Sequence, residues 1–194
     1  MKKNAGVSLV ELLVVVGIMM MLCALATPTI LIAINNMKLR SSAASLAGLV
    51  QETRMLAVRD NKFYTMRPTS IGSANFYYID LDENSTYRSG EELIQIAGVV
   101  KVVSSSTVPV KLTATNYVLE DAAPVSFNPR GLPCLATGTN PSTCPTMDAA
   151  GNQVGFVYYL YIQPYLSGSS SYKAVSVTPA GRVRIWSYSG GTWQ

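Results

Sequence analysis

Two arginines near the end of the chain are spaced so that they could bind a phosphate backbone. Arg182 and Arg184 lie two residues apart, which on a strand turns both side chains to one face, and Trp186 shares that face. Guanidinium groups pair with phosphates, and indole rings stack on bases. After Asp148 the sequence contains no acidic residue, while Lys173 adds a third cation to the segment. The segment is therefore a candidate nucleic-acid surface, and the alternative is a solvated outer face of a strand.

Few residues in this sequence could carry out catalysis. The 194 residues include no histidine, which excludes Ser-His-Asp triads, Cys-His dyads and histidine zinc sites. Three cysteines are too few for a four-cysteine zinc site. The run Asp80-Leu81-Asp82-Glu83 fits an acidic turn after a strand, or at most a weak calcium site. We therefore expect a protein that is not an enzyme and that uses no metal or cofactor.

Two of the cysteines are placed to form a loop-closing disulfide. Cys134 and Cys144 flank residues 135–143, which are rich in Gly, Thr, Asn and Pro. In an oxidising compartment such a pair favours a disulfide, worth about 2–3 kcal/mol for a loop of this length. The alternative is a redox-active pair. Cys23 lies in an apolar segment, where it acts as a small hydrophobic residue.

The N-terminal part of the chain is apolar enough to cross a membrane. Residues 7–34 are almost continuously aliphatic, and no charged residue occurs between Glu11 and Lys38. About 20 apolar residues suffice to span a hydrocarbon core of roughly 30 Å as a helix. Lys2-Lys3 precede the segment, which places the N-terminus in the cytoplasm and the rest outside. The alternative is a secretory signal cleaved after Ala24-Leu25-Ala26.

The residues around Glu11 identify the type of membrane segment. A charge within lipid costs roughly 2.5 kcal/mol or more, so an acid there requires a partner or a function. The polar leader Lys2-Lys3-Asn4-Ala5-Gly6, followed by Val7-Ser8-Leu9-Val10-Glu11-Leu12-Leu13, resembles the class III signal of type IV prepilins and type II secretion pseudopilins. The resemblance implies cleavage after Gly6 by a prepilin peptidase and N-methylation of Val7, although the family usually has phenylalanine there. Counted from Val7, Glu11 is the fifth residue, and Pro28 stands where these pilins carry a helix-loosening proline.

This resemblance also implies a way of assembling. The new amine of Val7 is a positive charge in an apolar setting, and Glu11 of a neighbouring subunit can neutralise it. Opposite charges attract strongly at low dielectric, whereas either charge alone is penalised. We therefore expect Glu11 to set the stagger between subunits in a filament. The expected partners are other pilin or pseudopilin subunits, the prepilin peptidase and the inner membrane.

The residue pattern predicts an α+β fold, in which a long N-terminal helix packs on a C-terminal antiparallel β-sheet or sandwich. The leader covers residues 1–6, the transmembrane and assembly half of the helix covers 7–34, and its amphipathic half covers 35–60. Apolar residues recur at helical spacing up to residue 59, and we expect the helix to be loosened at Pro28 and Gly48. Residues 61–194 form the β-rich domain, with strands expected at 62–67, 76–81, 99–103, 125–127, 154–162, 172–178 and 182–188.

Two further stretches resemble one branch of this family. The helical stretch 45–61 and the motif Gly181-Arg182-Val183-Arg184 are similar to features of FimT/FimU and GspH-type minor pilins. In the FimT-like members this motif is implicated in DNA uptake during natural transformation. The resemblance thus implies a single-pass protein of the bacterial inner membrane, with a periplasmic C-terminal domain, that is assembled into a pilus and binds double-stranded DNA through Arg182, Arg184 and Lys173. The alternatives are a GspH-type pseudopilin of type II secretion and a purely structural, pilus-priming subunit.

Overall fold

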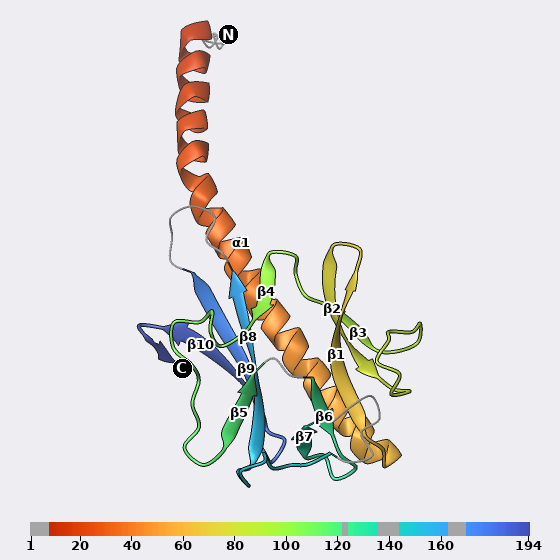
Figure 1. Ribbon diagram of the computed structural model, residues 1–194. Coiled ribbons are helices and arrows are strands. Elements are labelled where there is room, and N and C mark those ends of the chain that lie inside the picture. Colours follow the sequence, from red (N-terminus) through yellow and green to blue (C-terminus); the bar gives the residue numbers. More distant parts are fainter. Residues whose placement is uncertain (1–7, 122–123, 136–143, 163–169) are drawn as a thin grey trace, which may run out of the picture. The chain divides into compact units, whose positions relative to one another are not determined.

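The computed structural model describes residues 8–121, 124–135, 144–162 and 170–194. The chain divides into two compact units, residues 1–37 and 38–194, and each is described by itself. The secondary structure consists of helix α1 (Leu9–Asp60) followed by strands β1 (Tyr64–Ile71), β2 (Ala74–Asp80), β3 (Leu93–Gln95), β4 (Val100–Val103), β5 (Val118–Asp121), β6 (Val125–Phe127), β7 (Pro133–Leu135), β8 (Val154–Ile162), β9 (Ser171–Val177), β10 (Val183–Ser189) and β11 (Thr192–Trp193) (Figure 1).

The first unit contains the apolar half of α1. Among the described residues α1 is the helix whose length and composition would let it cross a membrane, with a mean hydropathy of 2.7 in its most apolar window. None of that window is buried within the chain, so the apolar side chains are free to contact lipid or other subunits. The helix continues through Pro28, and the preceding Thr27 hydroxyl donates a hydrogen bond to the Cys23 carbonyl at 2.8 Å.

The second half of α1 packs on the β-sheets. Its buried positions recur every three or four residues and include several alanines, which let the helix approach the sheets closely; they are Leu39, Ser42, Ala43, Leu46, Ala47, Leu49, Val50, Thr53 and Ala57. At the end of the helix Asn61 adopts a left-handed φ of 53°. The Lys62 N–H then donates to the Ala57 carbonyl at 3.1 Å, which closes the last turn in a Schellman-type cap.

Two sheets flank this part of the helix (Figure 1). One sheet has the strand order β3-β2-β1-β6-β7, and the other has the order β11-β10-β9-β8-β4. All of these neighbours are antiparallel, while β5 pairs with β8 in parallel. The predicted α+β fold, a long helix packed on antiparallel sheets, is confirmed.

The second sheet has a core on each face. Side chains of β8 and β9 that face the helix join the main core, which also includes α1 and the inner face of the other sheet. On the opposite face Val157, Tyr159 and Ala174 form a smaller cluster with Val108, and Trp186 and Trp193 pack against it. The alternation of side chains along β9 and β10 therefore decides which residues point toward the helix and which point away from it.

Candidate functional site

Arg54 of α1 connects the helix to two turns of the β-domain. Its Nε donates to the Gly131 carbonyl at 2.9 Å, and its Nη1 donates to the Gly181 carbonyl at 3.0 Å. Its Nη2 reaches the Ala180 carbonyl at 3.4 Å. One guanidinium thus fixes the turn before β7 and the turn between β9 and β10, which carries the Gly-Arg-x-Arg motif.

Glycine is required at Gly181 for two physical reasons. The residue has a left-handed φ of 75°, which other L-residues rarely adopt. A Cβ atom there would lie 2.6 Å from the Gly131 carbonyl oxygen and 2.8 Å from Arg54 Nε. The glycine of the motif is therefore explained by the close approach of three backbone and side-chain groups, independently of any ligand.

Arg184 lies on the outer face of the second sheet. Its guanidinium carbon sits 4.3 Å from the centre of the Trp186 ring, and the Trp186 Nε1–H donates to Ser176 Oγ at 2.8 Å. Together these three side chains line a hollow of about 290 Å³ with residues 112–117 and Leu119. The arrangement presents an exposed guanidinium held over an oriented indole, and guanidinium groups pair with phosphates.

Arg182 precedes β10 and lines a different hollow. This hollow, of about 630 Å³, is formed by α1 and the β9–β10 turn; its lining residues are Gln51, Arg54, Met55, Val58, Arg59, Gly181, Arg182 and Val183. Arg182 is exposed, and its backbone N–H donates to Thr178 Oγ1 at 3.1 Å. The two arginines of the motif are thus both accessible, but they border two separate hollows.

Lys173 does not lie with Arg184. It pairs with Ser187 in the β9–β10 register, whereas Arg184 pairs with Ser176, so the lysine points to the opposite, helix-facing side of the sheet. Its Nζ donates to Ser187 Oγ at 2.6 Å. Burial lowers the pKa of Lys173, and the positive charge of Arg40 lowers that pKa further. The predicted trio of cations is therefore divided between two faces.

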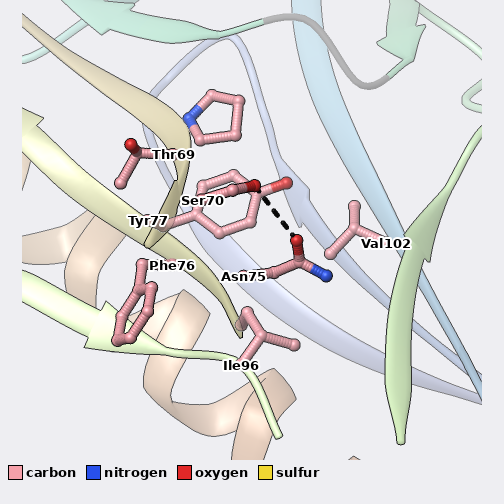
Figure 2. Close-up of a pocket in the computed structure, with 8 residues that line it drawn as sticks. Thr69, Ser70, Asn75, Phe76, Tyr77, Ile96 and Val102 are labelled. Carbon is pink, nitrogen blue, oxygen red and sulfur yellow. Dashed lines mark hydrogen bonds between the residues drawn. The ribbon is translucent and has the colours of Figure 1, made fainter. Parts of the chain in front are cut away.

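A third hollow opens beside the β1–β2 hairpin. It measures about 440 Å³, and Figure 2 shows hairpin residues on one side of it and Val102 on the other. Ser70 Oγ donates to Asn75 Oδ1 at 3.3 Å within its wall. Burial raises the pKa of Tyr77 in the lining to about 12. The lining carries no charged side chain, which makes it a poor surface for phosphate.

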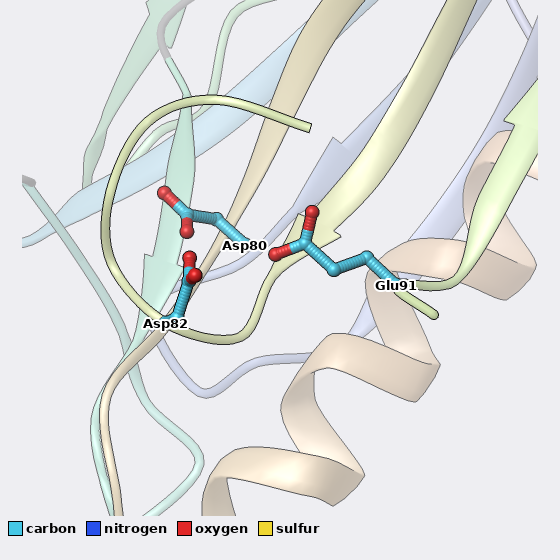
Figure 3. A group of neighbouring side chains, drawn as sticks. All are labelled: Asp80, Asp82 and Glu91. Atoms are coloured by element: carbon cyan, nitrogen blue, oxygen red, sulfur yellow. The ribbon is translucent and has the colours of Figure 1, made fainter. Parts of the chain in front are cut away.

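The acidic run after β2 forms a cluster with Glu91. One carboxylate oxygen from each of Asp80, Asp82 and Glu91 lies within 4.8 Å of the other two (Figure 3). Both Asp80 oxygens accept backbone N–H bonds from the following turn, and Oδ2 also pairs with Arg67 Nε at 2.8 Å. The two Glu91 oxygens likewise accept backbone N–H groups of Leu81 and Arg88. The carboxylates shape the loop, as expected for an acidic turn.

The predicted disulfide is present. Cys134 on β7 is bonded to Cys144, with a Cα–Cα distance of 5.2 Å, and residues 136–143 between them lie outside the described residues. Cys134 is fully buried next to β6. The bond therefore ties Cys144 to β7 at the edge of the first sheet.

The predicted processing site, Gly6 and Val7, also lies outside the described residues. Glu11 is in the first turn of α1 with an exposed side chain, among exposed aliphatic residues.

The role of Arg54 in positioning the two turns was not predicted from the sequence. In the sequence, Arg54 is one of several basic residues on the polar side of the helix. The carbonyl groups that it binds are 77 and 127 residues further along the sequence.

Comparisons with known proteins agree with the sequence motif. Residues 1–27 match the family described as the prokaryotic N-terminal methylation motif. The chain is also 33% identical over 129 residues to the pilin-like protein PilA1 of Thermus thermophilus, covering 66% of this chain and 78% of the relative. No solved structure matches the chain. With its N-terminal motif, its apolar helix and its packed β-domain, the chain belongs to the type IV prepilin-like pilins, which are structural subunits that assemble with other pilins.

Proposed function

We propose that this chain is a minor type IV pilin of the bacterial inner membrane that contacts double-stranded DNA during uptake. A prepilin peptidase cleaves it between Gly6 and Val7, and Val7 is then N-methylated. Residues 7–34 hold the subunit in the membrane before assembly, and the β-domain lies in the periplasm. The observation that carries the assembly part is Glu11, which stands in the first turn of a helix whose most apolar window has no residue buried within the chain.

The DNA-binding part is supported by the exposed arginines of the Gly-Arg-x-Arg motif. Arg184 is stacked over Trp186, and Arg182 is held on a turn fixed by Arg54. The chain has no acidic residue after Asp148, so the local field of the segment attracts an anionic strand. Because the two arginines border separate hollows, they would contact different phosphates. The expected binding is weak and independent of sequence, since phosphate contacts carry no base information.

We expect replacement of Arg182 and Arg184 by glutamine to weaken DNA binding at least fivefold without unfolding the protein, because both side chains are exposed. Fluorescence anisotropy of a labelled duplex measures this, with the full processed chain in neutral detergent at low salt. Two phosphate contacts give a log–log salt slope of about −2, and non-specific dissociation constants are typically about 10⁻⁴ to 10⁻⁶ M.

Lys173→Gln is the matched control, because it removes a cation of the same segment from the opposite face of the sheet. We expect it to change the affinity less than twofold. Equal binding by the wild type and the double arginine variant would contradict the DNA-binding role. The chain would then be a purely structural pilin or a GspH-type pseudopilin.

A further inference from the structure

The hollow between α1 and the β9–β10 turn has the composition of a protein interface, and we call it the Met55 hollow. Met55 is 65% exposed and Val58 is 51% exposed, which makes an apolar floor of accessible side chains together with Val183. Three arginines surround this floor, Arg54, Arg59 and Arg182. Methionine and arginine are enriched at protein–protein interfaces, whereas exposed apolar side chains do not bind phosphate groups.

The same chain carries a surface of opposite character on its other sheet. Residues 81–92 connect β2 to β3 and form what we call the acidic loop, with four acidic residues and the single basic residue Arg88. Leu81, at its start, is 37% exposed and is followed directly by Asp82 and Glu83. The acidic loop thus presents an apolar side chain next to carboxylates, as the Met55 hollow presents an apolar floor next to arginines.

We propose that the Met55 hollow of one subunit receives the acidic loop of a second copy of this chain. Leu81 would cover Met55 and Val58, and the loop carboxylates would lie against Arg59 and Arg182. Arg59 already pairs with Asp60 at 2.7 Å, but its side chain remains 70% exposed, so it can also attract a partner's carboxylate. The hydrogen bonds of Arg54 go to neutral carbonyl oxygens, which do not offset its positive charge.

This contact joins two different patches and therefore repeats in one direction. A heterologous contact of this kind builds an open helical chain when its rotation does not close into a ring, and a filament requires such an open chain. The contact joins one loop to one hollow, so we expect it to be weak by itself and to gain strength when the α1 helices hold the subunits side by side. The proposal rests on assembly of the chain into filaments. It does not rest on DNA binding, although both proposals use Arg182, and its test therefore changes Arg59 instead.

Cysteine cross-linking within filaments tests the proposal. Full-length Met55→Cys and Leu81→Cys chains, both with Cys23→Ala, are co-expressed in the host, and sheared filaments are oxidised. We expect a disulfide-linked dimer of this chain at least fivefold above the level given by Met55→Cys with Ile71→Cys. Ile71 is a stringent control, because this apolar residue of β1 is 47% exposed and Leu81 is 37% exposed. Adding Arg59→Glu to the Met55→Cys chain is expected to lower the dimer at least fivefold, and adding Glu83→Arg to the Leu81→Cys chain is expected to restore part of it.

The possible results separate docking from assembly and from DNA binding. If the chains are absent from filaments, the proposed function fails before docking is addressed, and chains mixed in neutral detergent at high concentration then decide the docking by the same cross-link. If the chains are present without a dimer above the control, the docking proposal is overturned. A cross-link to a subunit of another sequence also overturns it, as does protection of Met55→Cys from maleimide by duplex DNA but not by the second chain.

Discussion

Replacing Asp80 by alanine is expected to destabilise the second unit by about 3–5 kcal/mol. The Asp80 side chain is fully buried and pairs with Arg67, which is itself 17% exposed. It also accepts the backbone N–H groups of Asn84 and Ser85, at 3.2 and 3.0 Å. Alanine would leave a nearly buried guanidinium without its counter-ion and the Ser85 N–H without its Asp80 acceptor, while the Asn84 N–H would keep a longer bond of 3.4 Å to Asp82 Oδ1. Since domains are typically stable by about 5–15 kcal/mol, this is a large fraction of the total.

Asp82→Ala provides a matched control within the same loop. Asp82 pairs with Arg88 at 2.9 Å, but their side chains are 39% and 69% exposed. Solvent-exposed pairs contribute about 0–1 kcal/mol, so we expect little change. Urea unfolding of the detergent-solubilised chain, followed by tryptophan fluorescence, compares the two variants. Similar free energies of unfolding for both would show that the Arg67–Asp80 pair does not hold the β2–β3 loop.

Glu11→Ala is expected to abolish incorporation into filaments while leaving the chain in the membrane. The glutamate lies in an apolar helix that offers its side chains to lipid or to neighbouring subunits. If its partner is the amine of Val7 on another subunit, its removal leaves that amine buried and unpaired. Breaking such a pair costs about 3–5 kcal/mol, which is a factor of more than about 100 in an equilibrium constant. Membrane insertion should not become weaker, because the variant no longer carries a carboxylate whose transfer into lipid costs free energy.

Immunoblots of membranes and of sheared filaments measure both outcomes for Glu11→Ala. Glu52→Gln is the control, because it removes a glutamate from the same helix outside the apolar segment. We expect the control to enter filaments as the wild type does. Undiminished incorporation of Glu11→Ala would remove the charge-pairing argument for this subunit.

The long elements of this fold could be predicted from the sequence because their residue patterns are self-sufficient. Strand β8 has the predicted bounds, and the helix ends at Asp60, where the apolar periodicity stops. The three-residue strand β6 also has the predicted bounds, because Val-Ser-Phe alternates apolar and polar residues. The sequence pattern predicts that β1 ends before Pro68, but the strand runs to Ile71. β6 pairs with β1 only over Tyr64–Met66, so one edge of β1 is free at the proline, where a missing N–H is tolerated.

The remaining strands could not be predicted, since hydrogen bonds to neighbouring strands, and not their own residue patterns, define them. Strands β3, β5, β7 and β11 have two to four residues each and show no local alternation of their own. β5 in particular joins β8 in parallel, which no sequence-adjacent hairpin would indicate.

The candidate site divides in the same way. The spacing of Arg184 and Trp186 predicted their shared face, which the structure confirms. The separation of Lys173 from them depends on the β9–β10 register, which places it opposite Ser187. The role of Arg54 depends on carbonyl groups of turns distant in the sequence. The residues around Arg54 in the sequence therefore do not indicate these partners.

The central claim is that the chain is a prepilin whose leader is removed at Gly6. Intact-mass measurement of the protein extracted from host membranes tests it most directly. The account predicts a mass corresponding to loss of residues 1–6 and addition of one methyl group at Val7. Recovery of the full-length chain, or of a chain beginning after Ala26, would contradict it.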